Sequence, residues 1–395
     1  MKIDWLNLLV IAGLAVGHVA LFVACINRLY AIPVSDRVLD RARLALDALI
    51  VVLPLLFLWY YGVRGARLLR GGSWHAVPVP IQVYLGVCAC VAVLFAFFAV
   101  RRSLAGAVPV QVSSESRVVD IAERLGYRPI GNGPYRILTY LPWNQFLKLE
   151  ICTLEFRLPH LPAEWDGLSV LQISDLHFFG TPDRAYFEQL FQISATLPSD
   201  LIMFTGDLLD CEERIDWLES TFGQLKAPLG CFFVLGNHDW YLENTAEIRE
   251  KLVRLGWQGV AGRSVEIEHQ GRRLQIAGSE VPWMGTHPEF PAAAGGCFRI
   301  LLSHTPDNYP WAKTHSVDLM LSGHNHGGQV RLPLLGAIYT PSSFGTKYAG
   351  GTFWEAPTLL HVSRGVAGRQ PWRWNCLPEL TRIVLRSEKS HSSTS

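Results

Sequence analysis

The sequence predicts a layered α/β domain that follows an α-helical transmembrane region. Two observations lead to this prediction. Residues 1–100 contain long stretches without a charged side chain, although charged residues make up 17% of the whole chain. From about residue 165 onward, short apolar runs that end in polar or glycine residues alternate with amphipathic segments, as strands and helices do in α/β folds.

Three apolar runs form the predicted transmembrane region, residues 1–102. Residues 5–25 carry no charge and are long enough to cross a bilayer as a helix. Residues 48–63 form a shorter second run, and residues 81–100 form a third. A cleaved signal peptide would explain only the first run. We therefore expect about three spanning helices in a multi-pass membrane protein.

The arginines around these runs indicate an orientation. With three spans, the first connection and the soluble domain lie on one side of the membrane. That side collects six arginines, against three arginines and Lys2 on the other. The positive-inside rule then favours a cytoplasmic soluble domain.

Residues 103–164 are predicted to be a linker and a leading strand. The linker mixes Ser, Gly, Pro and charges without a long period, apart from a short helix expected over residues 118–125. Residues 148–157 alternate apolar and polar side chains, as a half-buried strand does. The soluble domain is then expected over residues 165–386, and a disordered tail over residues 387–395.

Five apolar runs of the soluble domain end in segments with candidate metal ligands. Functional side chains of α/β folds gather at the carboxyl ends of strands, so we expect these segments to meet. The runs cover residues 168–173, 201–204, 231–235, 300–302 and 317–321. Helices are expected between the early runs, over residues 183–197, 212–225 and 244–256.

The first two segments supply carboxylates. Asp175 and His177 are two residues apart, so on an extended chain both side chains point the same way and can reach one metal ion. Asp207 follows Gly206, which permits a tight turn. The two oxygens of its carboxylate suit a bridge between two metal ions.

The third segment, residues 236–239, adds an amide ligand and a candidate catalytic pair. Asn237 offers a neutral amide oxygen to a metal ion. His238 is expected to meet the substrate, with Asp239 fixing its orientation and favouring its protonated form.

The last two segments supply histidines. His304 follows one apolar run, and His324 and His326 lie two residues apart in a loop bounded by glycines, which suits ligation from a tight turn. Together, five ligand-bearing segments on successive strand ends indicate a paired-metal centre.

The order of these motifs, DxH…GDxxD…GNHD…H…GHxH, resembles the calcineurin-like metallophosphoesterase superfamily over about residues 166–385. Gly327-Gly328-Gln329, Leu332-Pro333 and Tyr339-Thr340-Pro341 are similar to the branch that contains small bacterial membrane-associated phosphoesterases. The resemblance implies a layered β-sandwich flanked by helices and a metal-dependent phosphoric ester or pyrophosphate hydrolase.

The resemblance also implies a role for each motif residue. His238 would contact the scissile phosphate and assist the leaving group, and Asp239 would support His238. Asp207 would bridge the two metal ions. The first ion would take Asp175, His177, Asp207 and His326, and the second Asp207, Asn237, His304 and His324.

The ligand set limits the choice of metal. Oxygen and nitrogen ligands without a thiolate suit Mn²⁺, Fe or Zn²⁺ better than a dedicated Mg²⁺ or Ca²⁺ site, and we expect Mn²⁺ first. Two such ions, roughly 3.5–4 Å apart, activate water and clamp phosphate oxygens.

The membrane segments favour a substrate that resides in the lipid bilayer. Related membrane-associated enzymes cleave the pyrophosphate of UDP-2,3-diacylglucosamine, which is the leading hypothesis. Nucleic acid is not expected as a partner, because the net charge is only +1. Four aromatic residues are candidates for apolar walls near the site: Trp283, Trp311, Phe344 and Trp354.

Other functions remain open from the sequence. A generic phosphodiesterase or a lipid-phosphate phosphatase would use the same metal centre. A membrane sensor or scaffold would keep the metal site for ligand binding, although the His238-Asp239 pair argues for turnover. A protein phosphatase is a further alternative.

Overall fold

The computed structural model describes residues 3–104, 106–291 and 297–388. The chain divides into two compact units, each described here by itself. One unit comprises Met1–Gly106 and Leu332–Gly345, and the other comprises Ala107–Arg331 and Thr346–Ser395.

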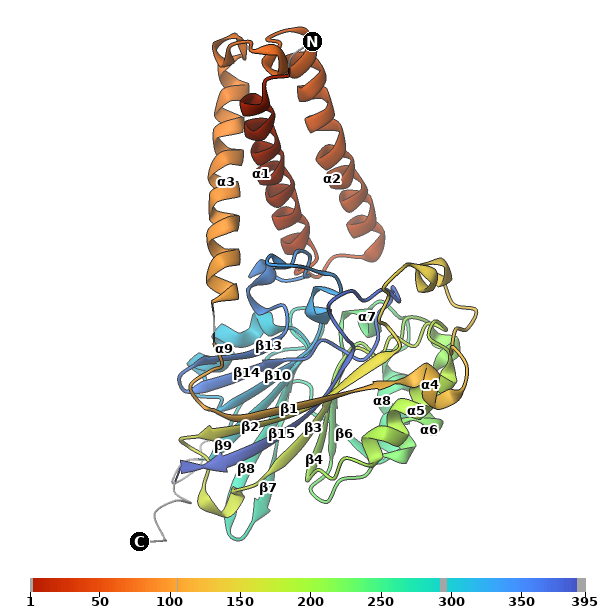
Figure 1. Ribbon diagram of the computed structural model, residues 1–395. Helices are drawn as coiled ribbons and strands as arrows, with labels where there is room; N and C mark the ends of the chain where they lie inside the picture. The colour runs from red at the N-terminus through yellow and green to blue at the C-terminus, as the bar shows by residue number, and fades with distance from the viewer. Residues whose placement is uncertain (1–2, 105, 292–296, 389–395) are drawn as a thin grey trace. The chain divides into compact units, whose positions relative to one another are not determined.

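Three long helices build the first unit (Figure 1): α1 (Trp5–Leu29), α2 (Asp36–Phe57) and α3 (Val79–Ser103). Among the described residues, three helical segments are long and apolar enough to cross a membrane, as the sequence predicts. The second of them continues beyond α2 through a π-helix, η1 (Leu58–Arg64). Each helix also extends beyond the corresponding apolar run.

The segment Leu332–Gly345 belongs to the helical unit, although the sequence places it inside the soluble domain. Asn27 of α1 is buried and donates to the carbonyl of Ile338 at 3.3 Å, while its own carbonyl accepts the N–H of Thr340 at 3.1 Å. The Arg43 guanidinium lies 4.9 Å from the Tyr339 ring. The domain boundary predicted from the sequence is therefore wrong here, because Asn27 and Arg43 of the helices find their partners in the inserted segment.

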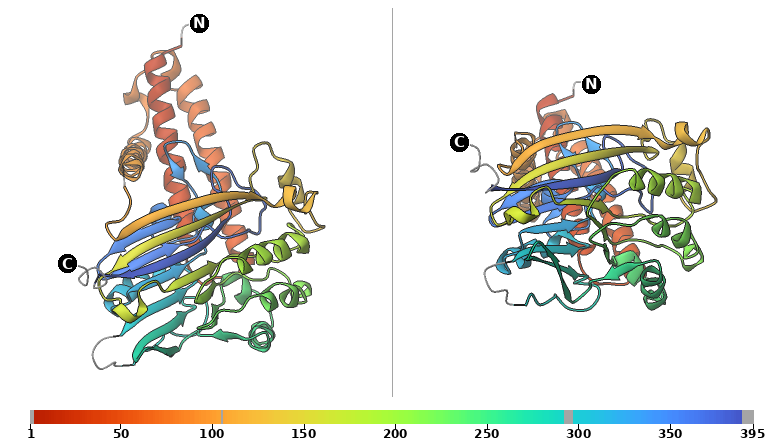
Figure 2. Two further views of the ribbon diagram at one scale, coloured as in Figure 1. Left: turned by 60° about the horizontal axis from the view of Figure 1, so that its bottom comes forward. Right: turned by 90° about the horizontal axis from the view of Figure 1, so that it is seen from below.

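Two sheets form the second unit (Figures 1 and 2). The seven-stranded sheet has, in spatial order, β1 (Gln111–Asp120), β2 (Lys148–Leu158), β15 (Glu379–Ser387), β3 (Ser169–Ile173), β4 (Leu201–Thr205), β5 (Cys231–Val234) and β6 (Trp257–Gly259). The six-stranded sheet has β13 (Gly351–Glu355), β14 (Thr358–Val362), β10 (Leu319–Ser322), β9 (Phe298–Ser303), β8 (Arg272–Ser279) and β7 (Ser264–His269). Apart from these two sheets, β11 (Arg331–Leu332) pairs with β12 (Gly336–Ala337), which belongs to the segment Leu332–Gly345 of the helical unit.

Buried side chains from both sheets pack into one core between them. Val170 and Phe232 of the first sheet belong to the same cluster as Ile300 and Leu321 of the second. The outer face of the seven-stranded sheet is covered by α5 (Arg184–Ala195), α6 (Trp217–Ser220) and α8 (Thr245–Arg254), and α9 (Tyr309–Thr314) packs on the other sheet. The predicted layered β-sandwich flanked by helices is confirmed.

The predicted linker is wrong in its central part. Residues 111–120 form β1, which pairs antiparallel with β2 along its length, from Gln111 opposite Phe156 to Asp120 opposite Lys148. The helix expected over residues 118–125 is α4 (Ile121–Leu125), and it starts later because Asp120 ends the strand and caps the helix. Most of the expected tail, residues 389–395, lies outside the described residues.

The strands that lead to the site are parallel. β3, β4, β5 and β6 pair in parallel in one sheet, and β8, β9, β10 and β14 do so in the other. Their carboxyl ends therefore lie along one edge of each sheet, where ligand sites of α/β folds form.

A buried ion-pair network ties β2, β15 and the loop after β14 together. The Arg364 guanidinium donates to Glu379 and, at 2.6 Å, to Glu150. Burial by itself raises the pKa of the Glu379 carboxyl, but Arg364 and His361 outweigh burial and hold that pKa well below its usual range.

We predict that Arg364→Met destabilises the fold by about 3–5 kcal/mol at pH 7, because Glu379 is left buried without its cation. A depressed folded-state pKa stabilises the fold above the ordinary glutamate value of 4.5, and this stabilisation is lost as the pH falls. The difference between wild type and variant should therefore shrink below that pH. Denaturant titration of detergent-solubilised protein measures it.

The matched control is Arg382→Met. Arg382 lies on β15, the strand that contains Glu379, and its guanidinium donates to the carbonyl of Pro198 at the surface. This control should change stability by no more than about 0.5 kcal/mol. Equal effects of the two substitutions on stability would show that Arg364 does not stabilise the fold as the cation of Glu379.

Candidate metal centre

Neighbouring parallel strands bring the first group of predicted ligands together. Asp175 and His177 follow β3, and Asp207 follows β4. The N–H of Asp175 donates to the carbonyl of Gly206 at 2.9 Å, so the two strand ends are held side by side. Gly206 has φ +98°, and a Cβ there would lie 2.6 Å from His304 Nδ1, so this turn requires glycine.

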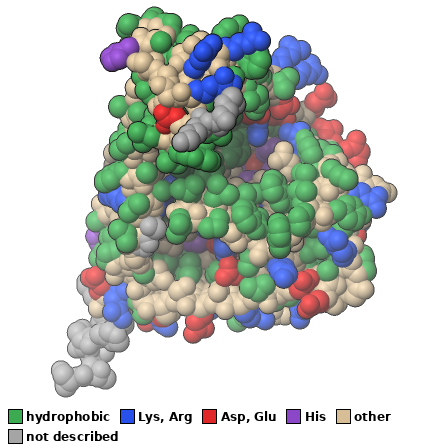
Figure 3. All heavy atoms as spheres, turned by 45° about the horizontal axis from the view of Figure 1, so that its top comes forward, with side chains coloured by type: hydrophobic (Ala, Val, Ile, Leu, Met, Phe, Trp, Pro, Cys, Tyr) green, Lys and Arg blue, Asp and Glu red, His purple; other side chains and the backbone are tan. Residues whose placement is uncertain are grey.

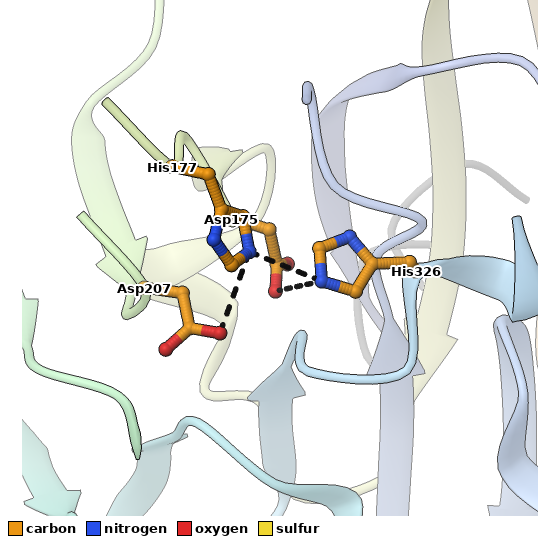
Figure 4. Close-up of side chains that lie close together, drawn as sticks. All are labelled: Asp175, His177, Asp207 and His326. Atoms are coloured by element: carbon orange, nitrogen blue, oxygen red, sulfur yellow. Dashed lines mark hydrogen bonds and ion pairs between the residues drawn. The ribbon is translucent and has the colours of Figure 1, made fainter. Parts of the chain in front are cut away.

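Four of the predicted ligands form one cluster (Figure 4): Asp175, His177, Asp207 and His326. Each offers a ligand atom, and these atoms lie within 4.8 Å of one another. His177 Nε2 is 3.1 Å from His326 Nε2 and 3.5 Å from Asp207 Oδ2. His326 Nε2 is 3.5 Å from Asp175 Oδ1.

A second cluster shares Asp207 with the first and adds His304 and His324. His304 Nε2 lies 3.2 Å from Asp207 Oδ2 and 3.1 Å from His324 Nδ1. The carbonyl oxygen of the Asn237 side chain is 3.1 Å from His304 Nε2. All seven residues predicted as ligands thus converge, and Asp207 lies in both groups.

The donor atoms fit a cation. His177 Nδ1 faces Asp210 Oδ2 at 2.8 Å, and His304 Nδ1 faces the carbonyl of Thr205 at 2.8 Å, so in each ring Nε2 points to the cluster. This is how metal-binding histidines are oriented in proteins. Among the described residues, the buried Asp175 Oδ2 has no hydrogen-bond partner. A cation would satisfy that oxygen.

The electrostatics of the cluster also fit a cation. Burial raises the pKa of Asp175. The pKa of Asp207 lies well below its usual range, because His304 and His238 outweigh the effect of burial. Burial and the neighbouring His177 lower the pKa of His326, which favours the neutral imidazole that binds metals.

Backbone strain is concentrated in this cluster. Five of the predicted ligands have left-handed φ values between 48° and 70°: Asp175, His177, Asp207, His324 and His326. This conformation costs a non-glycine residue roughly 1–2 kcal/mol. Such strain persists where the surrounding structure enforces it, typically at functional sites.

His238 lies beside the cluster with its side chain 18% exposed. Its Nδ1 is 2.6 Å from Asp210 Oδ1, and its backbone N–H donates to Asp207 Oδ1 at 2.9 Å. Burial lowers the pKa of His238, but Asp210 and Asp207 outweigh burial and raise that pKa to about 9. In the metal-free protein the imidazole is therefore protonated near neutral pH.

The prediction that Asp239 orients His238 is wrong. The Asp239 carboxylate is buried and accepts the N–H groups of Leu208, Leu209 and Gly236 at 2.8–3.2 Å, so it holds the turn after β4 against the start of α7 (Asn237–Trp240). Asp210 takes the predicted role. The second acid of the GDxxD motif was the signal for it, because it lies three residues after Asp207.

The loop after β14 adds two arginines that the motifs do not indicate. Arg369 Nε lies 3.8 Å from Asp210 Oδ1, and its side chain is 35% exposed. Arg373 is buried and donates to the carbonyl of His326 at 2.9 Å. No motif spacing links either residue to the strand ends.

Of the aromatic wall candidates in this unit, Trp283 lies at the site. Its ring centroid is 4.9 Å from that of His324. Trp311 instead stacks on His287 and His315, and Trp354 packs against the core between the sheets. Phe344 belongs to the helical unit.

Comparisons with known proteins agree with this site. The family model for the calcineurin-like phosphoesterase matches residues 168–328, which include all nine residues predicted as ligands or catalytic groups. The uncharacterized metallophosphoesterase YkuE of Bacillus subtilis is 31% identical over 239 residues, covering 58% of this chain and 82% of that protein. Phosphodiesterase YaeI of Escherichia coli is 28% identical, covering 55% and 81%.

A third relative is the UDP-2,3-diacylglucosamine pyrophosphatase LpxG of Chlamydia muridarum. It is 25% identical over 309 residues, which cover 62% of this chain and 92% of that protein.

We predict that Asp210→Asn lowers the pKa of His238 below its value of about 9, because the neutral amide removes the nearest negative charge. NMR titration of the histidine side chains in metal-depleted protein measures this pKa. The control Glu213→Gln, an exposed acid in the same loop, should leave the pKa unchanged. An unaltered His238 titration in Asp210→Asn would show that Asp210 does not set its charge.

Proposed function

The chain belongs to the calcineurin-like phosphoesterase family and is a metal-dependent phosphoester hydrolase, and we propose that it works at a membrane on a phosphodiester or pyrophosphate bond of a lipid-linked substrate. One observation carries the proposal: a paired-metal centre and three helices suited to cross a membrane occur in one chain.

We assign the metal ligands to two sites. The first would be formed by Asp175, His177, Asp207 and His326, and the second by Asp207, Asn237, His304 and His324. The two clusters that share Asp207 support this assignment. Two divalent ions, with Mn²⁺ expected first, would activate water and neutralise phosphate charge when bound.

His238 would act on the substrate rather than on a metal ion. Its Nδ1 is engaged by Asp210, which leaves Nε2–H to donate to a phosphate oxygen or to the leaving oxygen. Because its pKa is raised, the His238 imidazole would carry a proton and a positive charge near neutral pH. A protonated His238 held by Asp210 suits an enzyme that turns over its substrate, which argues against a sensor or scaffold that only binds ligands.

Arg369 would bind a further phosphate group. Its guanidinium lies next to Asp210 and over the Phe179 ring, at 5.6 Å from the ring centroid. A guanidinium can hold two phosphate oxygens at once, which suits a pyrophosphate. This arrangement favours a substrate with two linked phosphates over a simple monoester.

The leading candidate substrate is UDP-2,3-diacylglucosamine, supported by the similarity to LpxG along nearly its whole length. Its acyl chains reside in a bilayer, and its pyrophosphate would meet the metal centre. The arginine distribution favours a cytoplasmic metal centre at a bacterial inner membrane. The second candidate, a generic phosphodiesterase or lipid-phosphate phosphatase, is favoured by the similarity to YaeI.

Incubation of the purified full chain with Mn²⁺ and UDP-2,3-diacylglucosamine tests the leading candidate. Hydrolysis of the pyrophosphate should release UMP and the acylated sugar 1-phosphate, and mass spectrometry detects both products. Turnover of bis(p-nitrophenyl) phosphate without release of UMP would favour the second candidate. No turnover of any ester, with tight nucleotide binding, would favour the sensor.

We predict that Asp207→Asn and His324→Ala each reduce hydrolysis below about a tenth of the wild-type rate at saturating Mn²⁺, because each removes a ligand. The control His315→Ala, an exposed histidine at the end of α9, should keep full activity. Retention of more than that residual rate by His324→Ala would refute the ligand assignment.

We also predict that Arg369→Gln lowers kcat/KM for a pyrophosphate substrate by about 10- to 100-fold, the effect of losing a charge-assisted hydrogen bond. Hydrolysis of bis(p-nitrophenyl) phosphate, which has one phosphate, should change less. Arg263→Gln at an exposed position is the control. Equal losses on both substrates would show that Arg369 does not read the second phosphate.

A further inference from the structure

A cavity of about 570 Å³ lies among the three helices of the helical unit. Its walls include Ala15 of α1, Leu53 and Phe57 of α2, Tyr60 of η1 and Tyr84 of α3. We propose that this cavity binds one hydrocarbon chain of an anionic phospholipid, whose phosphate is held by three arginines at the adjacent end of the helices. None of these residues belongs to the metal centre, and the proposal does not rest on the hydrolytic activity.

The walls favour hydrocarbon over water. Apart from His18, the lining side chains are aliphatic, aromatic, proline or cysteine. The polar groups of His18 are engaged, because its Nδ1 lies 2.5 Å from the Tyr84 hydroxyl and its Nε2 lies 3.2 Å from the carbonyl of Leu49. Buried water needs two to four polar partners, and the lining side chains other than His18 offer only three tyrosine hydroxyls, of which that of Tyr84 is engaged by His18. The volume lies in the range of about 300–1,000 Å³ that is usual for ligand sites.

The second span changes from an α-helix to a π-helix along this wall of the cavity. Pro54 lies inside α2 and removes one backbone donor from the helix. The helix then continues as the π-helix η1, and both Tyr60 and Tyr61 of this element face the cavity. π-Helical turns are rare and are frequent at functional sites.

The charge at one end of the cavity identifies the lipid class. The lining residues lie in the halves of the helices next to residues 58–78, the connection between the second and third spans. That connection has three exposed arginines, Arg64, Arg67 and Arg70, and no acidic residue. Asp4 also lies at this end, where its carboxylate is engaged by the backbone and side chain of Asn7.

The surroundings match a lipid headgroup layer. The Arg64 guanidinium lies 4.5 Å from the Trp59 ring centroid, and Trp and Tyr are enriched where spans leave a bilayer. Figure 3 shows Lys and Arg side chains gathered at this end of the helical unit, beside a mainly hydrophobic surface. Basic sites at the ends of spans bind anionic headgroups.

Native mass spectrometry of the full chain in detergent tests the proposal. Phosphatidylglycerol and phosphatidylcholine with identical acyl chains serve as probes. The wild-type chain should retain one phosphatidylglycerol, on the order of tenfold better than phosphatidylcholine. Ala15→Trp fills the cavity and should abolish retention of both, whereas Leu9→Trp, on the exposed face of the same helix, should retain them as wild type does.

The headgroup is tested separately. Replacing Arg64, Arg67 and Arg70 together by Gln should remove the preference for phosphatidylglycerol and leave retention of phosphatidylcholine unchanged. The matched control replaces three exposed arginines at the other end of the helices by Gln: Arg28, Arg37 and Arg41. This control should keep the preference for phosphatidylglycerol.

A wild-type experiment covers the case in which Ala15→Trp does not fold. Phosphatidylglycerol with a photoactivatable acyl chain should cross-link to Leu53, Phe57 or Tyr84. Cross-links only to exposed positions such as Leu9, or equal retention of the two lipids by the wild-type chain, would overturn the proposal.

Discussion

The carboxylate of Asp207 is the point on which the rest of the site depends. One of its oxygens lies 3.5 Å from His177 Nε2 and 3.2 Å from His304 Nε2, so a single side chain contacts histidines that follow strands of two different sheets. Its other oxygen accepts the backbone N–H of His238 at 2.9 Å. The position of this one residue therefore relates both clusters and the neighbouring acid–base group to one another.

The two-sheet core makes this geometry possible at an energetic cost. Holding Asp207 and four other predicted ligands at left-handed φ values is unfavourable, and so is burying several carboxylates and imidazoles together. Well-packed apolar residues between the sheets and under the helices offset these costs. Hydrogen bonds to the backbone also stabilise this geometry, because the Asp239 carboxylate accepts N–H groups of the turn after β4 and fixes that turn.

The helical unit contains one of the sequence motifs together with the candidate membrane spans. It contains the three candidate spans together with Leu332–Gly345, a segment that begins six residues after His326. Asn27 binds the backbone of that segment on both sides of Tyr339, which gives the Tyr339-Thr340 motif a structural role. The motif that resembles membrane-associated relatives is thus part of the helical unit by its own contacts.

Local patterns in the chain are enough to predict the three helices, the order of the strands that carry ligands, and the identity of the seven candidate ligands. These features are local: apolar length, and side chains placed at strand ends. Three further features follow from long-range contacts: β1 joins the sheet, Leu332–Gly345 belongs with the helices, and Asp210 rather than Asp239 pairs with His238. Arg369 and the cavity among the helices likewise became visible only in the tertiary structure. Each of these depends on contacts between residues far apart in the chain, or on which of two buried carboxylates faces the His238 ring, and no local pattern encodes that choice.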